Sequence, residues 1–338
     1  MEVLKKVVVW SLMLVGSLLL LAGCGNSEEA SGNGSKTKEL KLAHNMSEEH
    51  SIHKALEKFS ESVDEKTNGE VKVKIYANGV LGGEKEVLEQ LQSGAVDMTK
   101  VSAGALESFS SDYSIFSLPY LFESKDHYRA VMESDVPDSI YQSTAEKGFI
   151  GIGYFDSGAR SFYTKDTPIE KPEDLKGVKV RVMDSPSAIE MVELFGGTPT
   201  PMPYGEIYTA LQQGVVDGAE SNETALTTGK HGEVAKVFSR NEHTIIPDVL
   251  IINKETWEGL TEDQQKAFQE AAQEATAYHT EMWDKSIEEA VKEAEEMGVE
   301  FYDVDKAPFI EAVQPMHDTF KEDPKMAEVM EEIESLKP

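Results

Sequence analysis

Arg181 is the residue whose type and setting point most directly to binding chemistry. It stands between Val180 and Val182, in a stretch where apolar and basic residues alternate, which predicts a half-buried strand. A guanidinium is always charged and presents a planar fork that matches a carboxylate. Near the carboxyl end of a strand, where α/β sheets bind ligands, it would hold an organic anion. The alternative is a surface ion pair.

Catalytic motifs are absent from the sequence. It has no G-x-S-x-G, H-E-x-x-H or G-x-x-x-x-G-K-S/T pattern. Of the eight His residues, only His50 and His53 stand at a spacing that could pair on a metal. They lie where we expect a helix to start and would face solvent or a cleft. We therefore expect no catalytic residue, no metal and no cofactor.

The first half of the chain alternates between strand and helix patterns. Leu40–His44 reads as a strand, and Ser51–Lys66 carries apolar residues at helical spacing. The apolar alternation at Val71–Ile75 predicts a second strand. A helix over Glu84–Gln92 and a strand that starts at Val96 complete the order βαβαβ, which favours a parallel sheet covered by helices.

A repeated sequence pattern, called here the internal echo, suggests that the second half of the chain also alternates between helices and strands. The strings Leu91–Asp97 and Leu211–Asp217 agree at five of seven positions. In each, a helix ends at a glycine, which readily adopts positive φ, and a strand follows. The echo predicts two similar α/β lobes, with coincidence as the alternative. A Pro- and Gly-free stretch from Thr261 to Met297 predicts one helix of roughly 50 Å, long enough to span both lobes.

The N-terminal residues indicate export. Lys5 and Lys6 precede an apolar run over Val7–Ala22, shorter than the roughly 20 residues of a membrane span, and this pattern reads as a signal peptide over residues 1–23. Leu21–Cys24 resembles the lipobox of bacterial lipoproteins, which implies lipidation of Cys24. A plain signal peptide and an uncleaved anchor are the alternatives. Residues 24–38 are rich in Gly, Ser and Asn and would form a flexible, lipid-anchored tether.

Composition narrows the class of protein further. The net charge of −30 argues against nucleic-acid partners. Cys24 is the only cysteine, so no disulfide can form within the chain, and an ordinary core must hold it. About 300 residues remain after the tether, which suggests two domains.

Five strings stand in a fixed order along the chain: Leu118–Phe122, Ser157–Tyr163, Leu175–Val182, Gly197–Met202 and Tyr208–Gly218. Together they resemble the DctP-type solute receptors of TRAP transporters, across essentially the whole mature chain. The resemblance implies a two-lobed, periplasmic-binding-protein-like α/β fold with a long helix spanning both lobes. It also implies closure of the lobes on an organic acid, and delivery of that acid to a membrane permease driven by an ion gradient.

The resemblance also suggests where the lobes divide. Lobe I would comprise residues 39–156 plus about 247–285, and lobe II residues 157–246 plus about 286–338. The chain would cross between them near Phe155–Ser157 and His243–Asp248, and we expect these crossings to act as hinges.

The site residues follow from the same resemblance. Arg181 would pair with the ligand carboxylate and Arg160 would assist it. Ser221 stands where relatives carry a ligand-binding Asn, so either Ser221 makes a shorter contact or Asn222 substitutes for it. The remaining candidates are Asn45, His44, Lys100, His243, Glu84 as a hydroxyl acceptor, Asp184 at the cleft opening and Tyr204 as an aromatic wall.

The strings Ser157–Tyr163 and Ser185–Met191 resemble those of receptors for sugar acids such as uronates. The expected ligand is therefore a sugar acid, bound outside the cell. Glu84, Lys100, Asn45 and Asn222 would supply partners for its hydroxyls. A C4-dicarboxylate would instead need a second cation, for which Lys100 or His243 could serve. An ABC-type receptor and an extracytoplasmic lyase anchored as a lipoprotein are the remaining alternatives, and the long helix favours the TRAP type.

Overall fold

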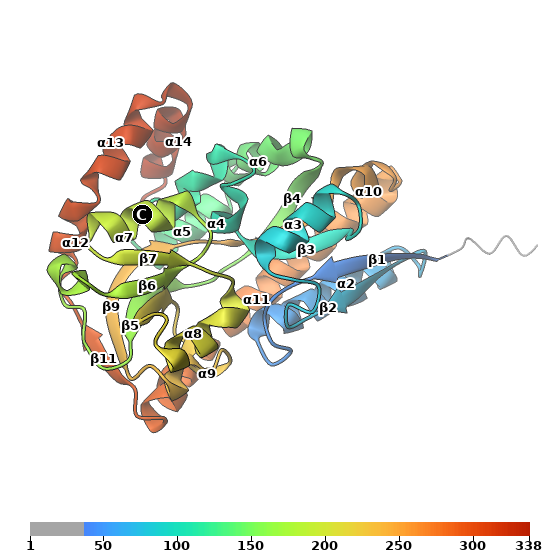
Figure 1. Cartoon of the computed structure of the whole chain (residues 1–338). Helices are drawn as coiled ribbons and strands as arrows, with labels where there is room; N and C mark the ends of the chain where they lie inside the picture. The colour runs from blue at the N-terminus through green and yellow to red at the C-terminus, as the bar shows by residue number, and fades with distance from the viewer. Residues whose placement is uncertain (1–36) are drawn as a thin grey trace, which may run out of the picture. The chain divides into compact units, whose positions relative to one another are not determined.

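A computed structural model describes residues 37–338 and contains two β-sheets (Figure 1). The first sheet has the strand order β2-β1-β3-β10-β4. In it β1 pairs in parallel with β2 and β3, whereas β10 is antiparallel to β3 and β4. Its strands are β1 (Lys38–Ala43), β2 (Val71–Tyr76), β3 (Met98–Ser102), β4 (Phe149–Phe155) and β10 (Asp248–Asn253).

The second sheet has the order β11-β9-β5-β8-β6-β7. Here β6 pairs in parallel with β7 and β8, and β5 is antiparallel to β8 and β9. The two sheets therefore share a core of three parallel strands followed by antiparallel ones. The strands are β5 (Ala159–Thr164), β6 (Lys179–Val182), β7 (Thr198–Pro201), β8 (Gly218–Ser221), β9 (Val237–Ile245) and β11 (Glu300–Asp303).

Helices cover both sheets and connect them. On the side of the first sheet lie α2 (Ser51–Lys66), α3 (Glu84–Gln92), α4 (Ala103–Leu106), α5 (Lys125–Met132), α6 (Val136–Tyr141) and α10 (Lys254–Glu258). The helices α7 (Pro186–Leu194), α8 (Ile207–Gln213) and α9 (Thr224–Thr227) connect strands of the second sheet. The last helices are α11 (Glu262–Glu296), α12 (Ala307–Ala312), α13 (Gln314–Glu322) and α14 (Pro324–Ser335).

The two segments of the internal echo have the same local structure. Gly94 and Gly214 end α3 and α8 with φ of +73° and +74°. The backbone N–H of Lys41 on β1 donates to Asp97 Oδ2 at 2.8 Å, and that of Lys179 on β6 donates to Asp217 Oδ2 at 2.9 Å. Each aspartate thus ties the chain that follows its helix to the parallel neighbour strand. The expectation of two similar α/β units is confirmed.

The predicted long helix is present as α11, with 35 residues. Thr261 caps it: its side chain accepts from the backbone N–H of Gln264, whose side chain accepts from the backbone N–H of Thr261. The helix contacts α2 and β4 on the side of the first sheet and α9 on the side of the second (Figure 1). It is therefore a continuous strut along both sheets.

The chain passes between the sheets at the two predicted crossings. Phe155 ends β4 in the first sheet and Ala159 begins β5 in the second, while Ile245 ends β9 and Asp248 begins β10. The lobe boundaries remain a prediction. The C-terminal helices touch both predicted lobes, because α12 contacts β9 whereas α14 contacts α6.

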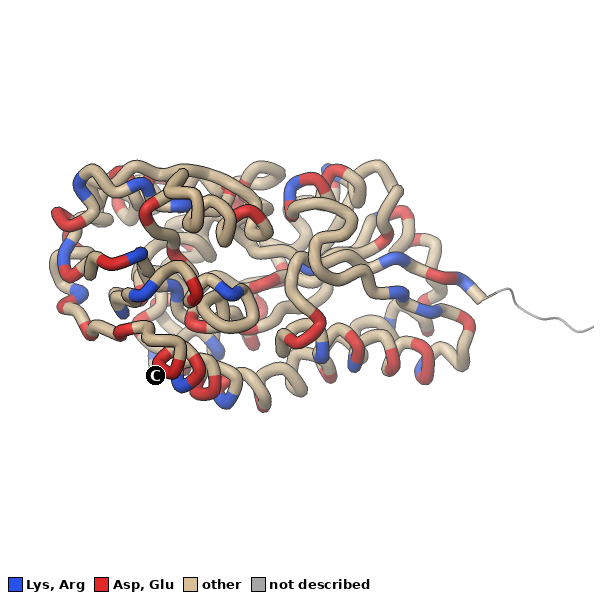
Figure 2. Tube along the Cα trace, turned by 60° about the horizontal axis from the view of Figure 1, so that its bottom comes forward, with Lys and Arg blue, Asp and Glu red and all other residues tan. Residues whose placement is uncertain are grey.

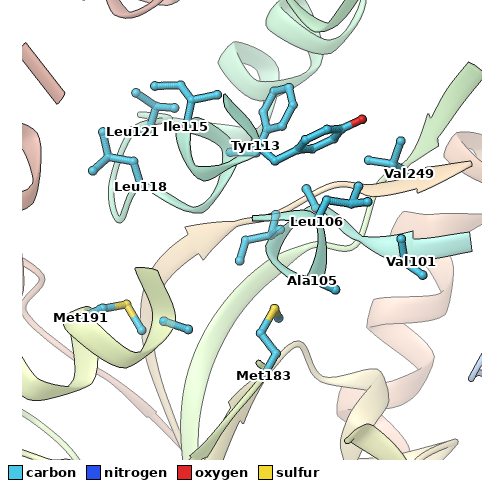
Figure 3. Packing of buried hydrophobic residues seen from close by; sticks show 14 of the residues in the cluster. Val101, Ala105, Leu106, Tyr113, Ile115, Leu118, Leu121, Met183, Met191 and Val249 are labelled. Atoms are coloured by element: carbon cyan, nitrogen blue, oxygen red, sulfur yellow. The ribbon is translucent and has the colours of Figure 1, made fainter. Parts of the chain in front are cut away.

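An apolar cluster joins residues near the two sheets (Figure 3). Met183, which follows β6, lies below Ala105 and Leu106 of α4, and Met191 of α7 belongs to the same cluster. A methyl group on Gly104 would stand 2.4 Å from Met183 Sδ, so only glycine allows this approach. The packing holds the end of β6, which carries Arg181, against α4.

The acidic composition is distributed along the chain. Figure 2 shows acidic and basic residues interspersed over the described part. Within residues 37–338, no helix has the length and apolarity that a membrane span requires.

The two aspartate ties should contribute unequally to stability. Asp97 is half-buried and also accepts from Thr256 Oγ1, whereas Asp217 is exposed. We expect Asp97→Ala to lower the free energy of unfolding by about 1.5–3 kcal/mol and Asp217→Ala by about 1 kcal/mol or less. Urea unfolding measures both. Asp318→Ala, on the exposed face of α13, is the control and should change little; equal losses for the two ties would contradict the assignment.

Candidate functional site

A small cavity of about 40 Å³ lies between the sheets. It forms where the parallel strands β1, β3, β6 and β8 end, which is where α/β sheets place their ligands. Both crossings border it, through Ser157 and Asp248. Seven of the predicted residues line it: Asn45, Glu84, Arg160, Arg181, Tyr204, Ser221 and Asn222.

Arg181 is a buried cation without a counter-ion. The residue is only 4% exposed, and its Nε and Nη2 both donate to the carbonyl oxygen of Met202, at 3.0 and 2.8 Å. Within residues 37–338, no carboxylate oxygen lies within 4 Å of it. Burial lowers the pKa of Arg181, although Glu220 farther away opposes the shift. Because a buried charge is normally paired, this position is suited to an anionic ligand.

Arg160, the second predicted anchor, already has a carboxylate partner. It donates to both carboxylate oxygens of Glu220, at 2.6 and 2.9 Å. His243 Nε2 lies 3.4 Å from the same carboxylate. Burial alone would raise the pKa of Glu220, but Arg160 and His243 outweigh it and hold that pKa at about 2. Arg160 therefore borders the cavity as half of an ion pair, and His243 lies behind that pair, outside the cavity lining.

Lys100 forms a second buried ion pair. Its Nζ donates to Asp248 Oδ2 at 3.1 Å and to Asn45 Oδ1 at 3.3 Å, and the lysine is fully buried. Glu84 Oε1 lies 3.9 Å from the same nitrogen and accepts from the backbone N–H of Ser102. Burial raises the pKa of Glu84 despite the nearby lysine. Lys100 thus acts on the cavity through Asn45 and is not part of its wall.

Ser221 and Asn222 can be distinguished by their partners. The amide of Asn222 is partly engaged: Nδ2 donates to Ser157 O at 2.7 Å, and Oδ1 accepts from the backbone N–H and the hydroxyl of Thr224, which leaves one N–H of Nδ2. The hydroxyl of Ser221 has no hydrogen-bond partner within the described part of the chain. Both side chains line the cavity, where Ser221 can donate or accept and Asn222 can only donate.

Three other predicted residues differ in position. Tyr204 lines the cavity wall, and burial raises its pKa to about 12, so the phenol stays protonated. Asp184 borders an adjoining outer pocket of about 290 Å³ and pairs with Lys85 Nζ at 2.9 Å. His44 does not line the cavity, since its Nδ1 accepts from the backbone N–H of Met46 and its Nε2 faces His53 Nδ1 at 3.0 Å.

The cavity contains residues that the sequence did not single out. Asp248 stands opposite Ser102 in the paired strands β10 and β3, and its carboxylate reaches Lys100, two residues earlier on β3. Met183 directly precedes the predicted Asp184, and Ser157 begins the Ser157–Tyr163 string that contains Arg160. His50 lines the cavity, in agreement with the expectation that it faces solvent or a cleft, whereas His53 is buried outside the lining. The other residues missed are Met46, Ile52, Ser102 and Thr224. Cys24 lies outside the described residues.

The solved structures that this chain resembles have the same fold. A TRAP periplasmic solute-binding protein from Anaerococcus prevotii, with bound α/β-D-glucuronate, is 38% identical with a TM-score of 0.87, covering 89% of this chain and 98% of that protein. Another from Xanthobacter autotrophicus, with bound β-D-galacturonate, is 37% identical with a TM-score of 0.86, covering 88% and 100%. The predicted fold class is thereby confirmed.

Sequence comparison leads to the same family. Protein YiiZ of Salmonella typhimurium is 45% identical over 288 residues, which are 85% of this chain and 88% of YiiZ. The family described as bacterial extracellular solute-binding protein, family 7, matches residues 42–323. With its two sheets, its spanning helix and a cavity at the strand ends, the chain belongs to this DctP family of TRAP transporter receptors.

Proposed function

We propose that this protein is the extracytoplasmic receptor of a TRAP transporter and binds a hexuronate in the cavity between its sheets. The observation that carries the proposal is Arg181, a buried guanidinium whose only hydrogen-bond acceptor among the described residues is a carbonyl. A carboxylate that leaves water needs a partner that replaces its hydration, and a guanidinium fork does so well.

The charges around the cavity favour one carboxylate over two. Three cations lie at or behind the wall, but Arg160 is paired with Glu220 and Lys100 with Asp248. Only Arg181 lacks a carboxylate partner within the described residues. A C4-dicarboxylate would need a second available cation, and His243 does not line the cavity. The presence of one cation without a carboxylate partner therefore supports a ligand with a single carboxylate.

The polar groups that remain suit the hydroxyls of a sugar. Glu84 Oε2 is an acceptor, the Asn45 Nδ2 group is a donor, and the Ser221 hydroxyl can act as either, with none of these atoms engaged within residues 37–338. The bound D-glucuronate and D-galacturonate of the two similar solved proteins support the same ligand class. Both are hexuronates, with one carboxylate and several hydroxyls.

Closure of the two lobes is part of the proposal. One water molecule needs a cavity of at least about 10–15 Å³. The cavity of about 40 Å³ therefore has room for a few water molecules but not for a sugar ring. The lobes must therefore move relative to each other for a hexuronate to bind. The crossings at Phe155–Ala159 and Ile245–Asp248 are the proposed hinges.

Anchoring and delivery complete the proposed function. The lipobox-like Leu21–Cys24 supports cleavage before Cys24 and attachment to the membrane through a lipidated cysteine. The receptor would then present its ligand to the permease subunits of the transporter. Membership in a family of solute receptors supports binding without catalysis.

A ligand panel tests the proposal directly. D-glucuronate and D-galacturonate should each stabilise the purified protein, by about 2.7 kcal/mol at a concentration of 100 Kd. D-glucose, which keeps the ring but lacks the carboxylate, and succinate, a C4-dicarboxylate, are the controls and should stabilise it little. Thermal unfolding measures the effect, and mass spectrometry should find the uronates unchanged. Stronger stabilisation by succinate, or conversion of a uronate, would contradict the proposal.

Substitutions of Arg181 test the anchor. Loss of one partner of a buried charged pair costs about 2–5 kcal/mol, so Arg181→Ala should weaken uronate binding roughly 30-fold to several thousand-fold. Arg181→Lys keeps the charge but loses the fork, and should bind between that variant and the wild type.

Calorimetric titration of folded protein gives these affinities. Arg240→Ala is the control, because Arg240 lies on β9, pairs with Asp303 and stacks on Phe301 away from the cavity. If Arg181→Ala binds within about threefold of wild type, the carboxylate is held elsewhere.

Replacement of Cys24 tests the anchoring. If Cys24 carries the lipid, Cys24→Ala should release the protein from the membrane fraction of the native cell. Fractionation followed by immunoblotting measures this, with Ser27→Ala in the tether as a control that stays membrane-bound. Retention of the Cys24→Ala protein in the membrane would indicate an uncleaved anchor instead.

A further inference from the structure

Glu107, the residue after α4, is a buried carboxylate that binds the start of α7. The residue is 8% exposed. Its Oε1 accepts from Ser185 Oγ at 2.8 Å, and its Oε2 accepts from the backbone N–H and the hydroxyl of Ser187, at 3.1 and 2.9 Å. Within residues 37–338, no cationic side chain lies within 4 Å of this carboxylate. Three donors at the start of α7 therefore take the place of a counter-ion.

These hydrogen bonds join elements that belong to different sheets. The helix α4 follows β3 of the first sheet, whereas α7 follows β6 of the second sheet, the strand that carries Arg181. Ser185 also caps α7, because its Oγ accepts from the backbone N–H of Ala188 at 3.1 Å. In the predicted division, Glu107 belongs to lobe I and Ser185 to lobe II. One carboxylate thus holds the start of a lobe II helix against lobe I.

Apolar side chains surround this contact. Ala105 and Leu106 of α4, Met183 after β6 and Met191 of α7 are all buried and belong to one cluster (Figure 3). Exposing such side chains to water costs free energy in proportion to their area. Separating a buried carboxylate from its donors adds the cost of the hydrogen bonds that are lost. We call Glu107, its partners on α7 and these apolar residues the α4–α7 junction, and we expect it to stay closed when the lobes part.

The segment that carries Glu107 is bonded to a chain crossing at both of its ends. The backbone N–H of Ala103, where α4 begins, donates to Pro247 O at 2.9 Å, in the crossing between β9 and β10. The backbone N–H of Tyr120 donates to His243 O at 2.8 Å, near the end of β9. Points that are close to a hinge move least when two domains rotate about it. The α4–α7 junction is therefore placed where it can persist during the motion.

The contacts at the outer pocket are easier to break. This pocket lies between the start of α3 and the turn after β7. Lys85 and Asp184 pair across it at 2.9 Å, but their side chains are 55% and 48% exposed, and such a pair contributes little to stability. Gly83 faces Pro203 through an apolar contact alone, in which a methyl group on Gly83 would lie 3.3 Å from Pro203 Cβ. Separation here would admit water to Arg181, which lines both the outer pocket and the cavity.

We propose that Glu107 is a positioning residue that keeps the α4–α7 junction closed while the lobes turn about it, so that the receptor opens at the outer pocket. The proposal rests on the proposed function, which it deepens in two ways. It gives the lobe motion a pivot and a direction. It also gives the sugar acid a route, past the outer pocket to Arg181.

Two distances measured by pulsed electron paramagnetic resonance test the pivot. Spin labels on Glu89→Cys and Glu206→Cys span the outer pocket, and labels on Ser108→Cys and Glu190→Cys span the junction. All four positions are exposed, and Cys24→Ala removes the only other cysteine. Saturating D-glucuronate should shorten the distance across the outer pocket by more than about 2 Å and leave the distance across the junction unchanged.

A substitution of Glu107 tests its role in the junction. Glu107→Gln keeps the shape of the side chain but replaces one acceptor oxygen with an NH2 group that opposes the donors of α7. We expect the distance across the junction to broaden, with and without ligand, and the affinity for D-glucuronate to fall about tenfold, as for the loss of one charge-assisted hydrogen bond. A residue that only stabilised the fold would lower the unfolding temperature without broadening this distance.

Calorimetric titration gives the affinities, with Glu193→Gln on the exposed face of α7 as the control that should change neither affinity nor distance. Equal changes in the two distances on addition of D-glucuronate would overturn this proposal while leaving uronate binding intact. A junction distance in folded Glu107→Gln as narrow as in the unsubstituted protein would overturn the role of Glu107. Failure of the wild type to bind any uronate would overturn the proposed function and this proposal with it.

Discussion

The site depends on one guanidinium that is buried without a counter-charge. Arg181 sits one residue before the end of β6, where Met183 packs against Gly104 and Leu106. The carbonyl of Met202 fixes its orientation through two hydrogen bonds but cannot neutralise it. Burying an ion carries a penalty of several kcal/mol unless it is paired. Among the three described cations around the cavity, only Arg181 carries this penalty, and it lines the cavity.

The neighbouring charges keep that position specific. Glu220 lies in the same region, but Arg160 and His243 hold it, so that it does not pair with Arg181. Asp248 is held in the same way by Lys100. Glu220 and Asp248 are thus each satisfied by a cation, whereas Glu84 keeps Oε2 without a partner among the described residues. The pairs also hold the antiparallel strands β5 and β10, which begin at the two crossings, in register with their parallel neighbours.

Local signals in the sequence predicted the elements well. The bounds of α2 and α3 agree with those expected from the apolar spacing, and the Thr261–Gln264 capping box marks the start of α11. Arg181 and Glu84 both line the cavity; the strand end indicated this position for Arg181, whereas Glu84 was expected there only from the family resemblance.

Side-chain partners far apart in sequence were not predictable in this way. Periodicity indicates which face of β3 carries Lys100. It does not indicate that Asp248 on β10, 148 residues later, pairs with this lysine. The hydrogen bonds left to Ser221 and Asn222 depend on Ser157 and Thr224, which occupy the oxygen and one N–H of the Asn222 amide. His44 turns from the cavity because the N–H of Met46 and the ring of His53 satisfy both its nitrogens.

The unpaired guanidinium also explains why closure should require the ligand. Without an anion, bringing the lobes together desolvates Arg181 and leaves its charge uncompensated, which favours the open form. A carboxylate removes that penalty only in the closed form, so its binding free energy differs between the two states, which is the condition for a population shift. A shift from 1:99 to 99:1 needs about 5.5 kcal/mol, and a buried charged pair supplies about 2–5 kcal/mol of it. Hydroxyl contacts from Glu84, Asn45 and Ser221 would supply the remainder. A neutral sugar of the same shape offers the hydroxyls alone and leaves the penalty in place.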